Sequence, residues 1–302
     1  MTLGFRAWSV CFFMDIRSVL YDATQDFEQM GFATPRLDAE VLLSRCMKTD
    51  RLRLYAHPEE TLTEEELQRF RNWVERRRGG EPVAYIIGQK EFWSLPFKVN
   101  NHVLIPRPET EMLLEAIIRT YSRGDFIQLM ILEIGTGSGA VSVALASELN
   151  NVRIVATDIS REALSVAVDN ARENGVQRQI SFRVGSFFEP VSEKFDIIVS
   201  NPPYISEEAF EHLPPGVREF EPRLALLAGT DGTAFHREII MQGAPYLKEG
   251  GRIFIEMGEG QKDRVIEIFK ESNLYDDIIF IRDYAGAERA FSARRKEDIL
   301  RG

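Results

Sequence analysis

The chain has 302 residues, of which 44% are hydrophobic and 28% charged, with a formal net charge of -10. This length and composition predict a globular protein with one sizeable α/β domain and a smaller companion. The acidic balance argues against a protein that holds nucleic acid mainly by phosphate neutralisation, because such binding needs a dominant basic surface. The two cysteines, Cys11 and Cys46, are too few for a disulfide framework and wrongly spaced for zinc. We therefore expect a reducing, cytoplasmic compartment and no metal.

The first stretch, MTLGFRAWSVCFFM, has one arginine and a short apolar run, as a signal peptide does. The run stops at Asp15 after too few residues, however, and no small-residue cleavage site follows. We therefore expect residues 1–14 to be a disordered extension. No later window approaches the roughly 18 consecutive apolar residues of a membrane span, so no membrane partner is expected.

Residues 15–79 have the pattern of helices only, with apolar side chains at spacings of three and four from Asp15 onward. Thr34 before Pro35 is typical of a cap followed by a first-turn proline. Thr63 and Glu66 form the pattern of a capping box that begins a further helix. The segment is predicted to be a small helical domain.

Residues 80–106 change toward a period of two, with apolar side chains between turn residues, which predicts a β-hairpin linking two domains. From residue 107 to 302, strand-like runs alternate with helical windows, and this alternation predicts βαβ units with a parallel sheet. The last run, IIFIRDYAGAERAFSARR, has two β-like segments around a Gly-containing turn. Because no helix separates them, we expect one antiparallel strand in the sheet. The runs assigned to strands are LMILEI, VRIVATD, ISFRV, FDIIVS and GRIFIEM.

A glycine-rich loop follows the first of these strands and opens a helix; its residues are Gly135, Thr136, Gly137, Ser138 and Gly139. Glycines at such a place let the backbone approach a ligand at a helix N-terminus. The alternatives are a tight strand-to-helix turn and a dinucleotide-binding loop, although the spacing G-x-G-x-G departs from the dinucleotide fingerprint.

The next strand ends in Asp158, at the carboxyl edge of the predicted sheet, where a carboxylate can accept hydrogen bonds from ribose hydroxyls. The same residue could instead cap the helix that begins near Ser160. Phe187, after the third strand, is placed either to cover an adenine face or to enter the core. These residues indicate a ribose-containing cofactor without naming it.

Asn201, Pro202, Pro203 and Tyr204 directly follow the apolar strand FDIIVS. A planar amide or exocyclic amine is a poor nucleophile because its lone pair is delocalised. The Asn201 side-chain oxygen and the Pro202 carbonyl can each accept one N–H of such a group, and the diproline stiffens the backbone that presents them. Tyr204 supplies a ring to pack on the flat group. The alternative is a plain chain stop, but the position beside the ligand crevice of the sheet favours the catalytic interpretation.

With these motifs in this order, the sequence resembles the class I methyltransferases, and more closely the release-factor glutamine methyltransferases of the PrmC/HemK family. The resemblance covers nearly the whole chain from Asp15. It is carried by RLDAEVLL, EPVAYIIGQKEFWSLPFKV, LIPRPETE, EIGTGSG, IIVSNPPYI, EPRLALLAGTDG and RAFSARR.

The resemblance implies a Rossmann-like α/β domain at residues 107–302 whose seven-stranded, mostly parallel sheet has one antiparallel strand. It also implies a substrate-recognition role for the helical domain. The implied cofactor is S-adenosyl-L-methionine, and the implied partner is a bacterial peptide chain release factor, methylated on the glutamine of its Gly-Gly-Gln loop.

By position in the motifs, the implied cofactor contacts are the glycine loop, Asp158, Phe187 and Asn201, and the implied glutamine cradle is Asn201 to Tyr204. Arg107 and Glu109 in LIPRPETE are expected either to shape the substrate entrance or to form an interdomain ion pair. Two positions depart from the family pattern. Glu133 stands where many relatives have Asp, and Ser186 stands where an acid is frequent, which puts a side-chain contact to the adenine amino group in doubt.

Three other functions are open at this point. A ribosomal-protein glutamine methyltransferase would share fold, cofactor and chemistry, although LIPRPETE favours a release factor. A DNA adenine-N6 methyltransferase would need a flipped base, a target-recognition region and a basic groove. A non-catalytic adaptor would keep only the fold, and the intact glycine loop and NPPY sequence count against it.

Overall fold

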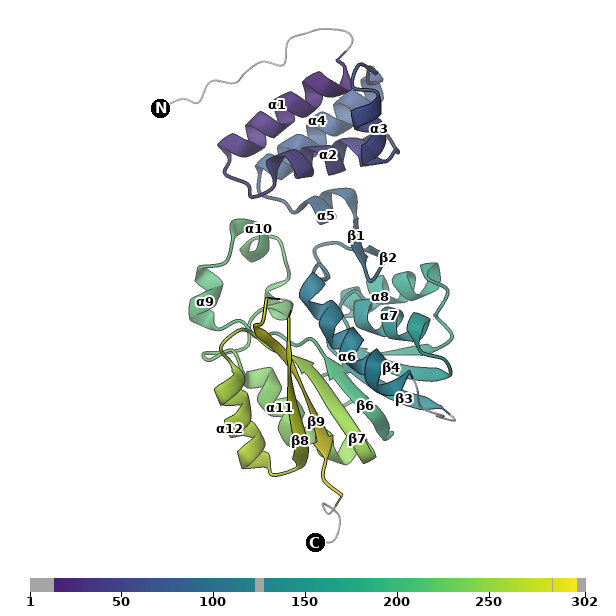
Figure 1. Cartoon of the computed structure of the whole chain (residues 1–302), viewed down its shortest axis with the longest axis vertical. Helices are drawn as coiled ribbons and strands as arrows, with labels where there is room; N and C mark the ends of the chain where they lie inside the picture. The colour runs from purple at the N-terminus through teal and green to yellow at the C-terminus, as the bar shows by residue number, and fades with distance from the viewer. Residues whose placement is uncertain (1–13, 123–127, 284, 298–302) are drawn as a thin grey trace. The chain divides into compact units, whose positions relative to one another are not determined.

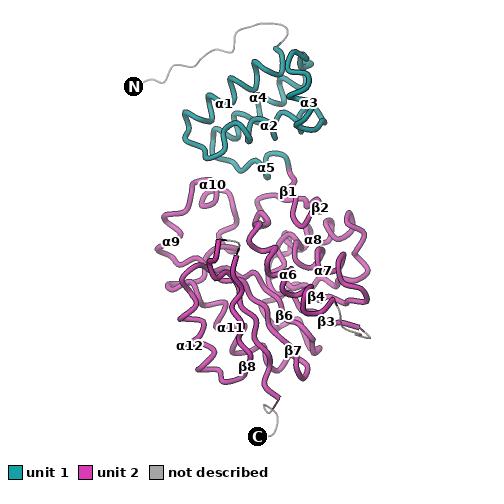
Figure 2. Tube along the Cα trace, viewed as in Figure 1, with its two compact units in different colours: residues 1–87 teal, residues 88–302 magenta. Residues whose placement is uncertain are grey.

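The computed structural model describes residues 14–122, 128–283 and 285–297. Of the extension predicted at residues 1–14, positions 1–13 lie outside the described residues. The chain divides into two compact units, residues 1–87 and 88–302 (Figure 2). Among the described residues, no helix is both long enough and apolar enough to span a membrane.

The first unit is a bundle of helices around one apolar core. Asp15 caps the first helix by accepting from the Ser18 backbone N–H, and Thr63 and Glu66 form the predicted capping box. Thr34 stands at the cap position, but its hydroxyl donates to the Asp38 side chain rather than accepting from a backbone N–H. The helices are α1 (Ile16–Gln29), α2 (Pro35–Cys46), α3 (Arg51–Ala56), α4 (Glu64–Arg78) and α5 (Val83–Ile87).

The stretch predicted as a hairpin linker contains a helix as well. α5 precedes the hairpin, which consists of β1 (Gln89–Phe92) and β2 (Leu95–Lys98). The chain divides after Ile87, so the hairpin belongs to the second unit. There Asn170 joins it to the glycine loop, because this side chain exchanges two hydrogen bonds with the Lys98 backbone and donates to the Ser138 carbonyl.

The second unit is built on a seven-stranded sheet with the order β5-β4-β3-β6-β7-β9-β8 (Figure 1). β9 pairs antiparallel with both neighbours and the remaining pairs are parallel, which confirms the predicted mostly parallel sheet with one antiparallel strand. The strands are β3 (Leu129–Ile134), β4 (Val152–Asp158), β5 (Ile180–Val184), β6 (Phe195–Ser200), β7 (Leu247–Glu256), β8 (Tyr275–Arg282) and β9 (Glu288–Arg295).

Helices cover both faces of the sheet, and successive strand residues feed alternate cores. In β6, Ile197 and Val199 enter the core beneath α6 and α7, whereas Ile198 enters the core beneath α11 and α12. The helices and short 3₁₀ turns of this unit are η1 (Pro108–Thr110), α6 (Glu111–Tyr121), α7 (Ala140–Glu148), α8 (Arg161–Glu173), α9 (Glu207–Glu211), α10 (Pro215–Arg218), η2 (Arg223–Ala225), α11 (Ala234–Gly243), η3 (Ala244–Tyr246) and α12 (Lys262–Ser272).

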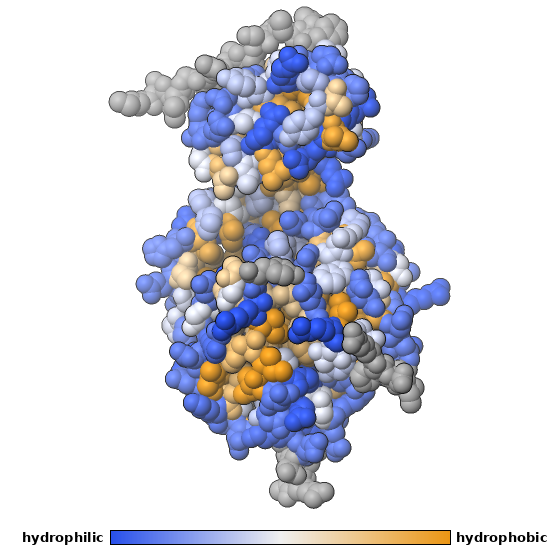
Figure 3. All heavy atoms as spheres, viewed as in Figure 1, coloured by the Kyte–Doolittle hydropathy of each residue, from blue (hydrophilic) through white to orange (hydrophobic). Residues whose placement is uncertain are grey.

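The edge strand β8 leaves part of its apolar surface in solvent. Ile278 is 38% and Ile279 50% exposed, and apolar side chains gather over this strand in the space-filling view (Figure 3). Asp276 and Asp277 precede them and pair with arginines of β9 and β7. Charges beside an edge strand oppose pairing with another chain.

Candidate active site

A cavity of about 390 Å³ opens in the second unit at the carboxyl edge of the sheet. Its wall contains most of the site residues predicted from the sequence, from segments far apart in the chain. Gly139, Tyr204 and Glu109 are the three predicted site residues that do not line it. Those that do are Arg107, Gly135, Thr136, Gly137, Ser138, Asp158, Phe187, Asn201, Pro202 and Pro203.

The glycine loop combines two different uses of glycine. Gly135 and Gly137 have φ values of +73° and +55° with open space at the position of a Cβ atom, so their backbone is accessible from the cavity. Gly139 has φ +79°, and a Cβ there would lie 3.1 Å from Ala167 Cβ. The third glycine therefore allows close packing on α8 rather than access to the cavity.

Asp158 fastens the glycine loop to the end of β4. Its carboxylate accepts from the Gly137 N–H at 2.8 Å and from the Ser160 N–H at 2.9 Å. The helix that follows is capped by Ser160, whose Oγ accepts from the Ala163 N–H at 3.0 Å. Burial raises the pKa of Asp158, against these backbone hydrogen bonds. The carboxylate thus lies in the cavity wall as a hydrogen-bond acceptor. The N-cap of α8 is Ser160 and not Asp158, which was the alternative considered from the sequence.

Phe187 lies in the cavity wall in a backbone conformation unusual for a residue with a side chain. Its φ is +45°, and its ring centroid lies 5.5 Å from that of Phe235, also in the wall. The next residue, Phe188, enters the core instead and stacks on Tyr246 at 4.6 Å. The left-handed backbone at Phe187 directs the two neighbouring rings to different places, so that Phe187 lines the cavity while Phe188 packs in the core. Ser186 also lines the wall.

Glu133 is a buried acid beneath the glycine loop. It accepts hydrogen bonds from the hydroxyls of Thr136, at 2.6 Å, and Ser142. Burial raises its pKa to about 7 despite these donors. The side chain thus links the end of β3, the loop and the first turn of α7.

Asn201 follows the last residue of β6 and is held by its amide nitrogen. Nδ2 donates to Thr110 Oγ1 at 3.0 Å, which fixes the orientation of the side-chain amide. Pro202 and Pro203 line the cavity beside it. Tyr204 points elsewhere: its hydroxyl donates to Glu256 Oε1 at 3.3 Å. Burial, and then the negative charge of Glu256, raise the pKa of the Tyr204 phenol above its ordinary value.

The sequence interpretation missed the segment from Glu256 to Gln261, which supports the Asn-Pro-Pro-Tyr turn from behind. Gln261 Nε2 donates to the carbonyls of Tyr204, at 2.9 Å, and Gly232, at 3.1 Å, and its Oε1 accepts from the Gly258 N–H at 2.8 Å. The available signal was position, because Glu256 ends the strand next to the one that precedes Asn201.

Arg107 and Glu109 differ in their surroundings. Arg107 lines the cavity, and its Nη2 lies 2.5 Å from Oε1 of the buried Glu221, which also accepts from the Ile105 N–H. Both partners of this ion pair lie in the second unit. Glu109 is exposed.

Comparison with known proteins decides the family. The family described as PrmC N-terminal domain matches residues 18–88, and the family described as Methyltransferase small domain matches residues 108–213. Proteins named release factor glutamine methyltransferase are 39% identical in Aliivibrio fischeri, over 91% of this chain and 96% of that protein, and 39% in Moorella thermoacetica, over 94% and 100%. The chain belongs to the release factor glutamine methyltransferase family.

This family membership makes the chain a methyltransferase and confirms the resemblance seen in its motifs. The relative in Coxiella burnetii is 41% identical over 87% of this chain and 92% of that protein. Among solved structures, the catalytic domain of hMettl16 in complex with a MAT2A 3′UTR hairpin has a TM-score of 0.55 and 15% identity, over 80% of this chain and 86% of that one. At this identity the likeness shows the methyltransferase fold alone.

Proposed function

We propose that this protein methylates the side-chain amide nitrogen of the glutamine in the Gly-Gly-Gln loop of bacterial peptide chain release factors, with S-adenosyl-L-methionine as donor. The observation that carries the proposal is the oriented Asn201 amide in the cavity wall, next to the glycine loop and Asp158. The names of the relatives support the substrate.

The residues of the cavity fit the cofactor. Asp158 offers a half-buried carboxylate with acceptor capacity beyond its two backbone donors, which suits ribose hydroxyls. Phe187 and Phe235 offer aromatic faces for a flat base. The glycine loop exposes backbone at the start of α7. When bound, S-adenosylmethionine supplies a methyl group on a sulfonium, which passes to the amide nitrogen while the electron pair of the S–C bond stays on sulfur.

The residues after β6 act on the glutamine. Asn201 Oδ1 and the Pro202 carbonyl accept the two N–H groups of the substrate amide and hold its nitrogen in a fixed orientation. Positive charge grows on that nitrogen as the new N–C bond forms, so the same two acceptors stabilise the transition state more than the neutral amide. The nitrogen then loses one proton to water, which leaves a neutral N-methyl amide.

The test is methyl transfer to a purified bacterial release factor in the presence of S-adenosylmethionine, followed by peptide mass spectrometry. We expect one added methyl group on the glutamine of the Gly-Gly-Gln peptide. A release factor whose glutamine is replaced by alanine is the matched control and should gain none. Labelling of a ribosomal protein or of DNA instead would overturn the substrate assignment.

A further inference from the structure

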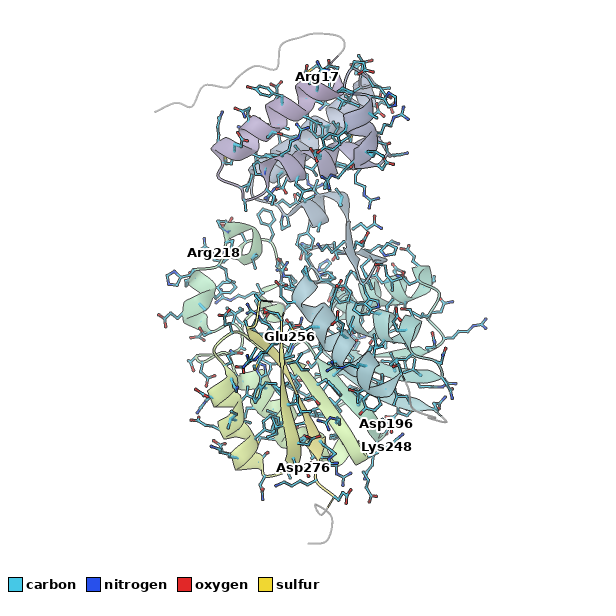
Figure 4. The ribbon with its side chains drawn as sticks, in the orientation of Figure 1. Arg17, Asp196, Arg218, Lys248, Glu256 and Asp276 are labelled. Atoms are coloured by element: carbon cyan, nitrogen blue, oxygen red, sulfur yellow. The ribbon has the colours of Figure 1, made fainter. Side chains whose placement is uncertain are left out.

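Glu256 is a buried acid that the proposed reaction does not use. It is 2% exposed, and it ends β7 at the opposite end of the sheet from the Asp196–Lys248 ion pair (Figure 4). A carboxylate is costly to bury unless donors surround it. The Tyr204 hydroxyl donates to Oε1 at 3.3 Å, and the Thr110 hydroxyl is the second side-chain donor that favours the charged form. Oε2 is buried without a hydrogen-bond partner among the described residues.

The Thr110 hydroxyl connects Glu256 to the catalytic amide. Thr110 is 4% exposed, and its Oγ1 accepts from Asn201 Nδ2 at 3.0 Å. A hydroxyl has a single proton, so once its lone pair faces Asn201 its own O–H is left for the carboxylate. An ionised carboxylate only accepts. The polar contacts therefore run in one direction, from the Asn201 amide N–H to Thr110 Oγ1 and from the Thr110 hydroxyl toward Glu256, whose pKa it lowers.

This direction decides which end of the Asn201 amide faces the cavity. With Nδ2 committed to Thr110, Oδ1 is the end that remains for a substrate N–H. A rotated amide would bring its NH2 group against the NH2 group of the substrate, and two donors repel. Tyr204 of the Asn-Pro-Pro-Tyr turn thus contacts the buried carboxylate directly, and Asn201 of the same turn is connected to it through Thr110.

We propose that Glu256 is a positioning residue for methyl transfer, which fixes the Asn201 amide with its oxygen toward the substrate by accepting from Thr110 and Tyr204. The inference rests on the proposed function and deepens it. Glu256 touches neither substrate nor cofactor in this role, and it acts through the two hydroxyls.

The charges around Glu256 set the pH range in which it can act. Burial raises its pKa to about 7; Glu109 of η1 adds to the rise and Arg289 of β9 opposes it. His236 of α11 contacts the Glu256 backbone carbonyl through Nε2, and burial lowers the pKa of this imidazole to about 4. His236 is therefore neutral where Glu256 titrates. Since the ionised carboxylate is the accepting form, kcat should rise with pH through about 7.

The test is the Glu256→Gln variant in methyl transfer to purified release factor with S-adenosylmethionine. Glutamine keeps the shape but turns an NH2 group toward one of the hydroxyls, so the direction of the bonds is lost. We expect kcat to fall roughly 10- to 100-fold, the KM for cofactor to stay unchanged, and the rise of kcat with pH to vanish. The melting temperature should not fall, because an amide is cheaper to bury than a carboxylate. Glu249→Gln, exposed on the same strand, is the control that should behave as wild type.

A second pair of variants tests the same series of bonds without changing the acid. Thr110→Val removes the hydroxyl at nearly constant volume and should reproduce the loss in kcat, whereas Thr110→Ser keeps the hydroxyl and should retain most of it. Wild-type kcat and pH profile in Glu256→Gln, with normal labelling by the wild-type enzyme, would overturn this inference alone. A wild-type enzyme that labels no release factor would overturn the proposed function and this inference with it.

Discussion

Among the described residues, the Asn201 side chain makes its hydrogen bond through the amide nitrogen, because Nδ2 donates to Thr110 Oγ1. Replacing Asn201 by alanine removes the acceptor proposed for the substrate N–H and leaves Asp158 and the glycine loop intact. We expect kcat for release-factor methylation to fall roughly 100-fold or more, with cofactor affinity from calorimetry largely unchanged. Equal losses of both quantities would contradict the role given to Asn201.

Asp158 is the residue on which cofactor affinity should depend most. In Asp158→Asn the amide NH2 group must face either the Gly137 or the Ser160 N–H, both of which now donate to the carboxylate. We expect the Kd for S-adenosylmethionine to rise roughly 10- to 100-fold, as the loss of charge-assisted hydrogen bonds predicts. Asp276→Asn is the matched control, because Asp276 lies at the far end of the sheet in an exposed ion pair (Figure 4). Similar affinities for the two variants would exclude Asp158 from the cofactor site.

Within the glycine loop, substitutions at Gly139 and Gly137 should have different effects on stability and on cofactor binding. Gly139→Ala places a Cβ 3.1 Å from Ala167 Cβ in a left-handed conformation, so the free energy of unfolding should fall by about 1–3 kcal/mol. Gly137→Ala meets open space and bears only the cost of its φ angle, but its new methyl group enters the cavity.

Urea unfolding and cofactor titration separate these two variants. Gly139→Ala should lose mainly stability, whereas Gly137→Ala should lose mainly cofactor affinity. If both variants lose affinity and stability to the same extent, the division of roles within the loop is wrong.

The sequence predicted elements well where local pattern decides. The runs LMILEI, VRIVATD, ISFRV and FDIIVS coincide with β3, β4, β5 and β6. β7 begins earlier than GRIFIEM, at Leu247, because pairing with Phe195 extends it across a register shift that no local pattern records. In the same way α5 lies inside the stretch predicted as a hairpin linker, where its five residues are too few to show a helical period.

The residues of the candidate site show the same difference between local sequence pattern and long-range contacts. Most residues of the contiguous motifs line the cavity, but the sequence did not connect Thr110 and Glu256 with Asn201 and Tyr204. The two hydrogen bonds that join them span 91 and 52 positions in the chain, so only the folded sheet brings the partners together. Gly139 and Tyr204 belong to the motifs yet do not line the cavity, which spacing alone does not reveal.

At the scale of the whole molecule, buried acids should make stability depend on pH. Burial raises the pKa of Glu133 from 4.5 to about 7, so the folded state binds more protons than the unfolded state between these values. The contribution of this group to stability is therefore present at low pH and lost as pH rises through that range, by about 3 kcal/mol in total. His236, whose pKa is lowered to about 4, acts in the opposite direction.

Because several groups contribute, the test is the difference between a variant and the wild type. The melting temperature of Glu133→Gln relative to wild type should become more favourable from roughly pH 5 to pH 8. Glu249→Gln, which is exposed, should show a constant difference. A difference for Glu133→Gln that does not change with pH would show that this carboxyl is not buried as the structure has it.

The two units also allow a separation of functions. Each has its own apolar core, so the second unit should fold without residues 14–87. We expect this deletion to leave the Kd for S-adenosylmethionine unchanged and to raise the KM for release factor, measured by initial rates of methyl transfer. Unchanged substrate kinetics would remove the recognition role proposed for the helical unit.

The most direct measurement is peptide mass spectrometry of a purified bacterial release factor incubated with this enzyme and S-adenosylmethionine, in parallel with the Asn201→Ala variant. One methyl group on the Gly-Gly-Gln glutamine, made by the wild-type enzyme and not by the variant, is the result expected from the site described above. A release factor that stays unmodified with the wild-type enzyme, or that is methylated at another residue, would contradict it.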